Sequence, residues 1–163
     1  MDFLLRLEQT GFATWVREAG TLWSYATILF LHTLGLATLA GISGSISLRI
    51  LGFGRQIPLS PLGRFYPLLW LAFGITAASG TALLIADATT RLTSPIFYIK
   101  MVFVGLAVAN MQLVKRHVLA APGADDGVLP ASARLLAVAS LLLWIAATTA
   151  GRLMAYLGPV GGL

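Results

Sequence analysis

The feature that most constrains this chain is an apolar stretch over residues 22–48 that contains no formal charge. An α-helix rises about 1.5 Å per residue, so about 20 apolar residues cross the hydrocarbon core of a bilayer. Lipid offers no hydrogen bonds to the backbone, whereas a helix satisfies its own. The stretch therefore predicts a membrane-spanning helix with His32 inside it.

Three further apolar runs meet the same length criterion. They cover residues 65–86, 96–118 and 135–157. Of the 163 residues, 58% are hydrophobic and only 10% are charged, whereas soluble domains carry about 25% charged residues. The connections between the runs are too short to separate domains. We therefore expect one all-α domain over residues 1–163, an integral membrane four-helix bundle.

The first part of the chain has a different pattern. Residues 2–18 mix aromatic and aliphatic side chains with charged ones. This pattern is typical of an amphipathic helix that lies in the membrane interface. Gly11 is the position where such a helix could break, because glycine is a poor helix former.

The basic residues lie at the ends of the apolar runs, which indicates contact with the lipid bilayer and argues against a nucleic-acid partner. Six lie in the first connection or flank the third, and three lie on the opposite side of the membrane: Arg49, Arg55, Arg64, Lys115, Arg116 and Arg134 against Arg6, Arg17 and Arg91. The positive-inside rule then predicts that both termini are outside the cytoplasm.

Small residues recur four apart in all four runs. The sets are Ala37, Gly41 and Ser45; Gly74 and Ala78; Gly105 and Ala109; Ala147 and Gly151. Small residues let helix backbones approach closely in lipid. We expect these faces to meet within the bundle, and they could also support a homo-oligomer or a larger membrane complex.

Three ionisable residues lie within the predicted spans, namely His32, Lys100 and Arg152. Each costs roughly 2.5–3.5 kcal/mol to insert, so such residues tend to be functional. Counted at helical rise, His32 lies roughly 13 Å beyond Trp23, and the two cations lie roughly 7–10 Å from the same membrane face. Trp144 lies close to the level of His32. We expect one polar pocket in the outer half, with the cations above the histidine and the indole.

This pocket favours a redox cofactor, with a b-type heme as the first hypothesis and His32 as its metal ligand. Gly35 lies one turn from His32 and would let the ring approach the backbone. Lys100 and Arg152 would pair with the propionates, and the Trp144 indole N–H would need an acceptor.

The second axial position is left open by the sequence. Heme iron accepts His, Met or an open position there. Met101 and Met154 lie at usable depths, whereas His117 lies at the opposite membrane face. A quinone headgroup polarised by His32 and the cations is a variant that needs no second ligand.

Two other classes of function remain open. The protein could be a non-catalytic assembly subunit, in which the pocket is an internal hydrogen-bonded network and the outer face binds a partner. It could also transport a small solute or metal ion as an oligomer. The motifs of soluble enzymes, such as a phosphate-binding glycine loop or HExxH, are absent from the sequence, so enzymatic activity stays undecided.

Several short segments carry a resemblance to a known family. They are HTLGLA at 32–37, LRILG at 48–52, SG at 79–80, ADA at 86–88, SPIF at 94–97 and GRLMAY at 151–156. Across nearly the whole chain they resemble a family of small four-helix bacterial inner-membrane proteins known only as a domain of unknown function. The chain is more loosely similar to copper-resistance-D-type and b-type cytochrome membrane domains. The resemblance implies a four-helix inner-membrane fold and no particular activity.

Overall fold

The computed structural model describes residues 2–19, 23–121 and 129–156, and every regular element in these ranges is helical. The elements are α1 (Asp2–Glu8), α2 (Gly11–Glu18), α3 (Tyr25–Leu51), η1 (Ser60–Phe65), α4 (Tyr66–Ala86), α5 (Ala88–Thr93), α6 (Pro95–Val114), η2 (Lys115–Leu119) and α7 (Ala131–Tyr156). η1 is a 3₁₀-helix and η2 is a π-helix. The all-α prediction is confirmed.

In the part of the chain that the structure describes, four helices are long and apolar enough to cross a membrane, which indicates a multi-pass membrane protein. They cover Tyr25–Leu51, Ser60–Ala86, Pro95–Leu119 and Ala131–Met154. The predicted spans coincide with these helices to within a few residues. The second span begins earlier than predicted because the 3₁₀ turn of η1 leads directly into α4.

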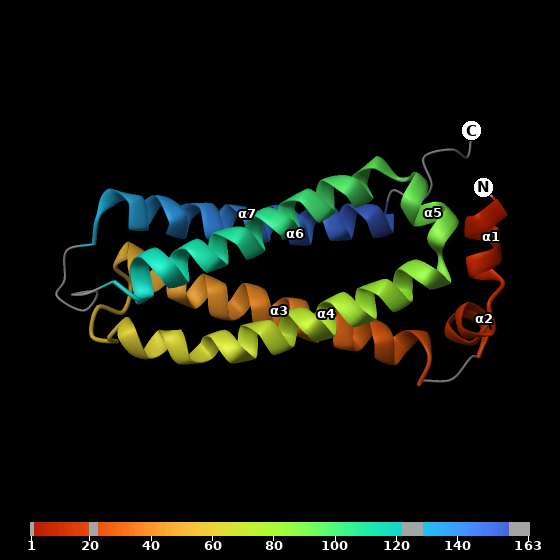
Figure 1. The fold of residues 1–163 in the computed structure, drawn as a ribbon, viewed down its shortest axis with the longest axis horizontal. Helices are drawn as coiled ribbons and strands as arrows, with labels where there is room; N and C mark the ends of the chain where they lie inside the picture. Colours follow the sequence, from red (N-terminus) through yellow and green to blue (C-terminus); the bar gives the residue numbers. More distant parts are fainter. Residues whose placement is uncertain (1, 20–22, 122–128, 157–163) are drawn as a thin grey trace.

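The four spans form two pairs, α3 with α4 and α6 with α7, and α3 also packs against α7. Figure 1 shows that the pairs lie close together at the end that carries η1 and η2 and separate toward α5. The end that carries η1 and η2 is the closed end of the bundle. There, Tyr66 Oη donates a hydrogen bond of 2.7 Å to the Met111 carbonyl, which joins α4 to α6. The hydrophobic core surrounds this contact and includes Leu39, Ile46 and Leu69.

The open end of the bundle contains less buried side-chain surface. Within α3, no residue from Tyr25 to Leu34 is buried, and within α6 none from Pro95 to Leu106 is buried. α1, α2 and α5 lie at this end (Figure 1), as does the end of α7. The first turns of α3 and α6 are therefore less buried than the rest of these helices, and the predicted polar pocket lies toward that end.

The prediction that the small-residue faces meet within the bundle is wrong for three of the four spans. The residues in question are exposed: Ala37, Gly41, Ser45, Gly74, Ala78, Gly105 and Ala109. A Cβ atom added at Gly41, Gly74 or Gly105 would meet nothing within 4 Å. These runs are apolar on all sides, so the sequence pattern does not show which face points inward. In α7, by contrast, Ala147 is buried.

The close contact between α3 and α4 lies at a different glycine. A Cβ atom at Gly35 would lie 2.3 Å from Thr76 Oγ1 and 2.9 Å from the Ala72 carbonyl oxygen. Gly35 is itself buried. The absent side chain therefore makes room for α4, in place of the cofactor contact that the sequence suggests for this residue.

We predict that Gly35→Ala lowers the free energy of unfolding by about 1–3 kcal/mol, because the added methyl group has no space against α4. Gly41→Ala is the matched control on the same helix, since its added methyl group meets open space. Both substitutions raise helix propensity equally, so any difference reports the contact. Thermal unfolding of the two variants in detergent measures this, and equal midpoints would contradict the packing described here.

Candidate functional site

His32 extends from α3 toward α4, where two oxygen atoms approach its Nδ1 atom. The Thr76 carbonyl oxygen lies at 3.0 Å and Ser79 Oγ at 3.3 Å. A carbonyl oxygen can only accept, so Nδ1 carries the proton and donates it. The Ser79 hydroxyl proton already goes to the Ile75 carbonyl at 2.6 Å, so this oxygen also acts as an acceptor toward the ring.

The other ring nitrogen of His32 is consequently the reactive one. In the neutral imidazole, a proton on Nδ1 leaves the lone pair on Nε2. No residue in the described part of the chain makes a hydrogen bond to Nε2. His32 therefore presents an oriented lone pair that can bind a metal ion or accept a proton.

A second glycine, on α4, makes room for the His32 ring. A Cβ atom at Gly80 would lie 2.9 Å from His32 Cε1 and 3.2 Å from Nδ1. The ring thus occupies the space that a side chain on α4 would fill. His32 and Gly35 lie three residues apart, on one face of α3, and both contact α4. The same close approach of the helices makes room for the ring and brings it to the Thr76 carbonyl.

Lys100 of α6 is half-buried and lies against α7, with its Cε 3.6 Å and its Nζ 3.9 Å from the position of a Cβ atom at Gly151. Among the described residues it has neither a hydrogen bond nor an ion pair. The nearby Arg91 has an acidic partner, because its Nε atom lies 3.4 Å from Asp87 Oδ2. The charges of Lys100 and Arg91 both act electrostatically on His32. Lys100 is thus a cation near the histidine whose charge no described carboxylate balances.

Trp144 of α7 is the third polar side chain of this region. It is only 4% exposed, and its indole Nε1 has no hydrogen-bond partner in the part of the chain that the structure describes. Trp144 and Gly151 are two helical turns apart, so they share a face of α7, and Lys100 contacts that face. A buried N–H without an acceptor is costly and calls for a ligand or water.

The other predicted site residues lie farther from this arrangement. Arg152 is exposed, because it follows Gly151 on a different side of α7. Met101 is 43% exposed and Met154 is half-buried. His117 is exposed in η2 at the opposite end of the bundle, as the sequence predicts. The structure thus places His32 against α4 and Lys100 against α7, and leaves Arg152 and Met101 on the outer surface.

Sequence reasoning did not identify the partners of His32. Thr76, Ser79 and Gly80 are spaced three and four residues apart, on one face of an apolar helix. This spacing is the signal that could have shown a polar face turned toward another span. The short helix α5 was also missed, although Asp87 and Arg91 have the i, i+4 spacing of a helical ion pair.

The predicted amphipathic segment 2–18 consists of two helices, α1 and α2. The helix is interrupted just before Gly11. There, the Thr10 hydroxyl accepts a hydrogen bond from the backbone N–H of Ala13 at 3.3 Å and caps α2. The inner side of α2 buries Ala13 and Val16, whereas Phe12 is 46% exposed.

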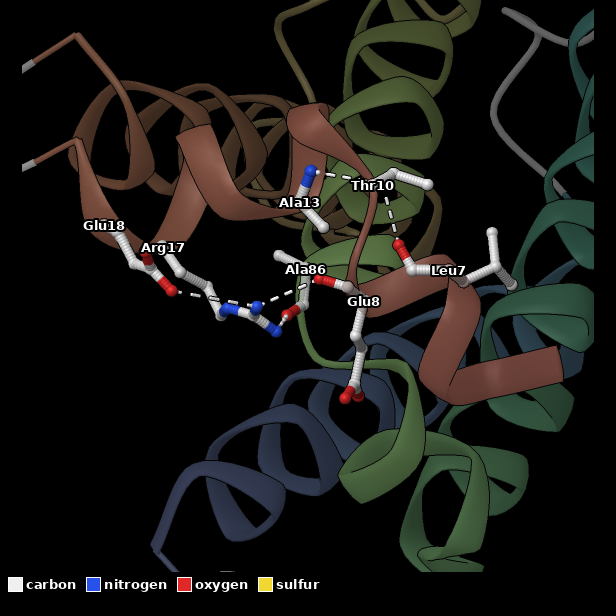
Figure 2. A network of polar contacts seen from close by, with 7 residues as sticks. All are labelled: Leu7, Glu8, Thr10, Ala13, Arg17, Glu18 and Ala86. Carbon is white, nitrogen blue, oxygen red and sulfur yellow. Dashed lines mark hydrogen bonds and ion pairs between the residues drawn. The ribbon is translucent and has the colours of Figure 1, made fainter. Parts of the chain in front are cut away.

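A network of polar contacts fastens α1 and α2 to the open end of the bundle (Figure 2). The Arg17 guanidinium donates to the Ala86 carbonyl at 3.1 Å and to the Glu8 carbonyl at 2.9 Å. The Glu8 carboxylate accepts the backbone N–H of Thr89 at 2.6 Å. Arg17 thus satisfies the last turn of α4, and Glu8 satisfies a free N–H at the start of α5. This end cap orders α5, which carries Arg91.

Comparison of the chain with protein-family models, with curated proteins and with solved structures gave no match in any of the three. In residues 2–19, 23–121 and 129–156, no group of three or more His, Asp or Glu side chains is placed to hold a metal ion. The function is therefore argued from the geometry around His32.

We predict that Glu8→Ala weakens the end cap and speeds hydrogen exchange at the Thr89 amide. A hydrogen bond to a charged group contributes about 1.5–3 kcal/mol, which corresponds to roughly tenfold or more in local opening. Glu18→Ala is the control, since Glu18 is exposed and reaches Arg17 only at 4.0 Å. Exchange measured by NMR in detergent tests this, and equal rates in the two variants would show that Glu8 does not hold α5.

Proposed function

We propose that the protein is a small membrane subunit that binds a redox cofactor, a b-type heme, at His32. The observation that carries this proposal is the Nδ1–H of His32 fixed on the Thr76 carbonyl, which leaves Nε2 without a partner in the described residues. Histidines that bind metals typically donate their other N–H to a carbonyl or carboxylate in this way. One protein ligand suffices for heme iron, because the macrocycle supplies four nitrogens.

The charge of Lys100 favours heme over an uncharged ligand. An unpaired ammonium group in a membrane span is costly, and an anionic group beside it would remove that cost. Heme propionates are carboxylates of this kind. The exposed Arg152 is next to Gly151, which Lys100 contacts, so its long side chain has the reach to support the same carboxylates from the membrane surface.

Three residues would have different roles in heme binding. His32 would hold the iron, Lys100 would orient the carboxylate edge, and the buried indole of Trp144 would donate to an acceptor on the ligand. If heme has a second protein ligand, Met154, which is half-buried, would be a better candidate than Met101, which is 43% exposed. Bound heme would supply one-electron redox chemistry.

A quinone is the second candidate, and the unpartnered His32 Nε2 and Trp144 Nε1 in the described residues favour it. The free lone pair of His32 Nε2 can accept a proton from a quinol hydroxyl, and the Trp144 N–H can donate to a quinone carbonyl. A bound quinone would leave the charge of Lys100 without a partner, so we place the quinone hypothesis second. A non-catalytic assembly subunit draws support from the exposed small-residue faces, which offer close packing to a second copy or another chain.

We predict that His32→Ala abolishes heme binding, because no other described histidine lies at this depth. Lys100→Met should weaken retention of heme without abolishing it, through loss of the propionate partner. His117→Ala is the matched control, since it removes a histidine at the opposite end of the bundle. The measurements are a reduced-minus-oxidised visible spectrum and a pyridine hemochrome assay on protein purified from cells supplied with heme.

Equal heme content in wild type and His32→Ala would exclude His32 as the ligand. A colourless wild-type protein would overturn the heme proposal. Organic extraction of the same sample would then separate the two remaining readings, because a stoichiometric quinone supports the second candidate and its absence supports an assembly subunit.

We also propose a bacterial inner-membrane location with the His32 site facing away from the cytoplasm. The support is the charge distribution, with six Lys and Arg residues in or beside the loops at the η1–η2 end and three at the α5 end. α1 and the end of α7 lie at the same end of the bundle (Figure 1). A carboxy-terminal alkaline phosphatase fusion should therefore be active, and a fluorescent protein that folds only in the cytoplasm should be dark. The opposite pair of results would invert the orientation.

A further inference from the structure

A small cavity lined by both polar and apolar side chains lies between the four spans, away from the candidate site. Its volume is about 10 Å³. The lining comes from α3, α4, α6 and α7 and consists of Ser43, Ile46, Ser47, Tyr66, Leu69, Met111, Val114 and Ser140. All eight residues are buried. A cavity of this size has room for about one water molecule, provided that polar partners surround it.

Ser43 supplies the first of these partners. It is 5% exposed, and its Oγ atom has no hydrogen-bond partner among the described residues. Most serine and threonine hydroxyls on the spans donate to a carbonyl of the preceding turn, as Ser47 Oγ does to the Ser43 carbonyl at 2.7 Å. A buried hydroxyl that makes no such bond in a membrane protein is costly, because neither lipid nor an apolar core can replace it.

The same cavity offers acceptors. Tyr66 donates its proton to the Met111 carbonyl, and Ser47 donates its proton to the Ser43 carbonyl. Both hydroxyl oxygens therefore keep lone pairs that can accept from a molecule in the cavity. A third serine, Ser140 of α7, is 3% exposed and lines the cavity from another helix.

We propose that this cavity binds one water molecule, which accepts the Ser43 hydroxyl proton and donates to the oxygens of Ser47 and Tyr66. The ligand class follows from the lining. The lining includes no carboxylate to balance a cation, and the volume is too small for an organic molecule. Water both donates and accepts, which matches the unpaired Ser43 hydroxyl beside two hydroxyl oxygens that can accept.

The water would link α3 to α4 at the end where the helix pairs converge. The Tyr66–Met111 hydrogen bond already joins α4 to α6 at this level. A bridging water would extend that connection to α3. The polar contact would then hold together the closed end of the bundle, from which the pairs diverge toward His32. The inference does not depend on which cofactor binds at the open end.

Ser43→Ala distinguishes a hydrated cavity from a dry one by the direction of the effect. If water is bound, the substitution removes one of its hydrogen bonds and should lower Tm by about 2–4 °C for a chain of this size. If the cavity is dry, the substitution removes an unpaired buried hydroxyl, and Tm should stay the same or rise. Ser45→Ala is the matched control, because Ser45 is exposed on the same helix and its Oγ donates to the Gly41 carbonyl.

The direct measurement is a high-resolution experimental structure of the full chain and of its Ser43→Ala variant. We expect a density peak within hydrogen-bond distance of Ser43 Oγ in wild type, and a lost or weakened peak in the variant. An empty cavity in wild type would overturn the proposal. So would a Tm for Ser43→Ala that equals or exceeds that of Ser45→Ala.

Discussion

The close approach of α3 and α4 is the interaction on which the candidate site depends. Gly35 leaves no room for a side chain beside Thr76, and the ring of His32 occupies the place that a side chain at Gly80 would fill. Two glycines on facing helices thus bring the imidazole within 3.0 Å of the Thr76 carbonyl. Without the hydrogen bond to the Thr76 carbonyl, the ring would not be fixed, and the direction of the Nε2 lone pair would not be defined. The close packing of the two helix backbones therefore sets the geometry of the candidate site.

The bundle has unequal ends. At the η1–η2 end, large side chains such as Leu69 fill the space between the helix pairs, and Tyr66 joins α4 to α6. Toward the α5 end the pairs separate, and Lys100 lies there without a described partner. Trp144 lies at the boundary, since its ring belongs to the core while its N–H is unpaired. In a membrane, polar groups without partners are costly, which is why the proposed ligand site is placed among them.

Much of the architecture could be predicted from the sequence, because length and hydropathy suffice for it. Four uncharged or nearly uncharged runs give four spans, and the mixed pattern of residues 2–18 gives a separate helical segment. Length and hydropathy could not predict which face of each helix points into the bundle. Spans that are apolar all round carry no periodic signal for the inward side. For this reason the spacing of Gly41, Gly74 and Gly105 predicts an interior position, although these residues lie on the outside.

The sequence by itself determined how far along its helix each polar residue lies, since this distance follows from counting at a known rise. It thereby placed His32 and Lys100 in the same half of the bundle. Only the tertiary structure decided which residues meet, because that depends on how each helix is rotated about its own axis. Rotation puts Arg152 on the surface and the Lys100 side chain against Gly151, and it gives His32 the Thr76 carbonyl as its partner. The rotation is set by close contacts between backbones, and these depend on pairs of residues far apart in the chain.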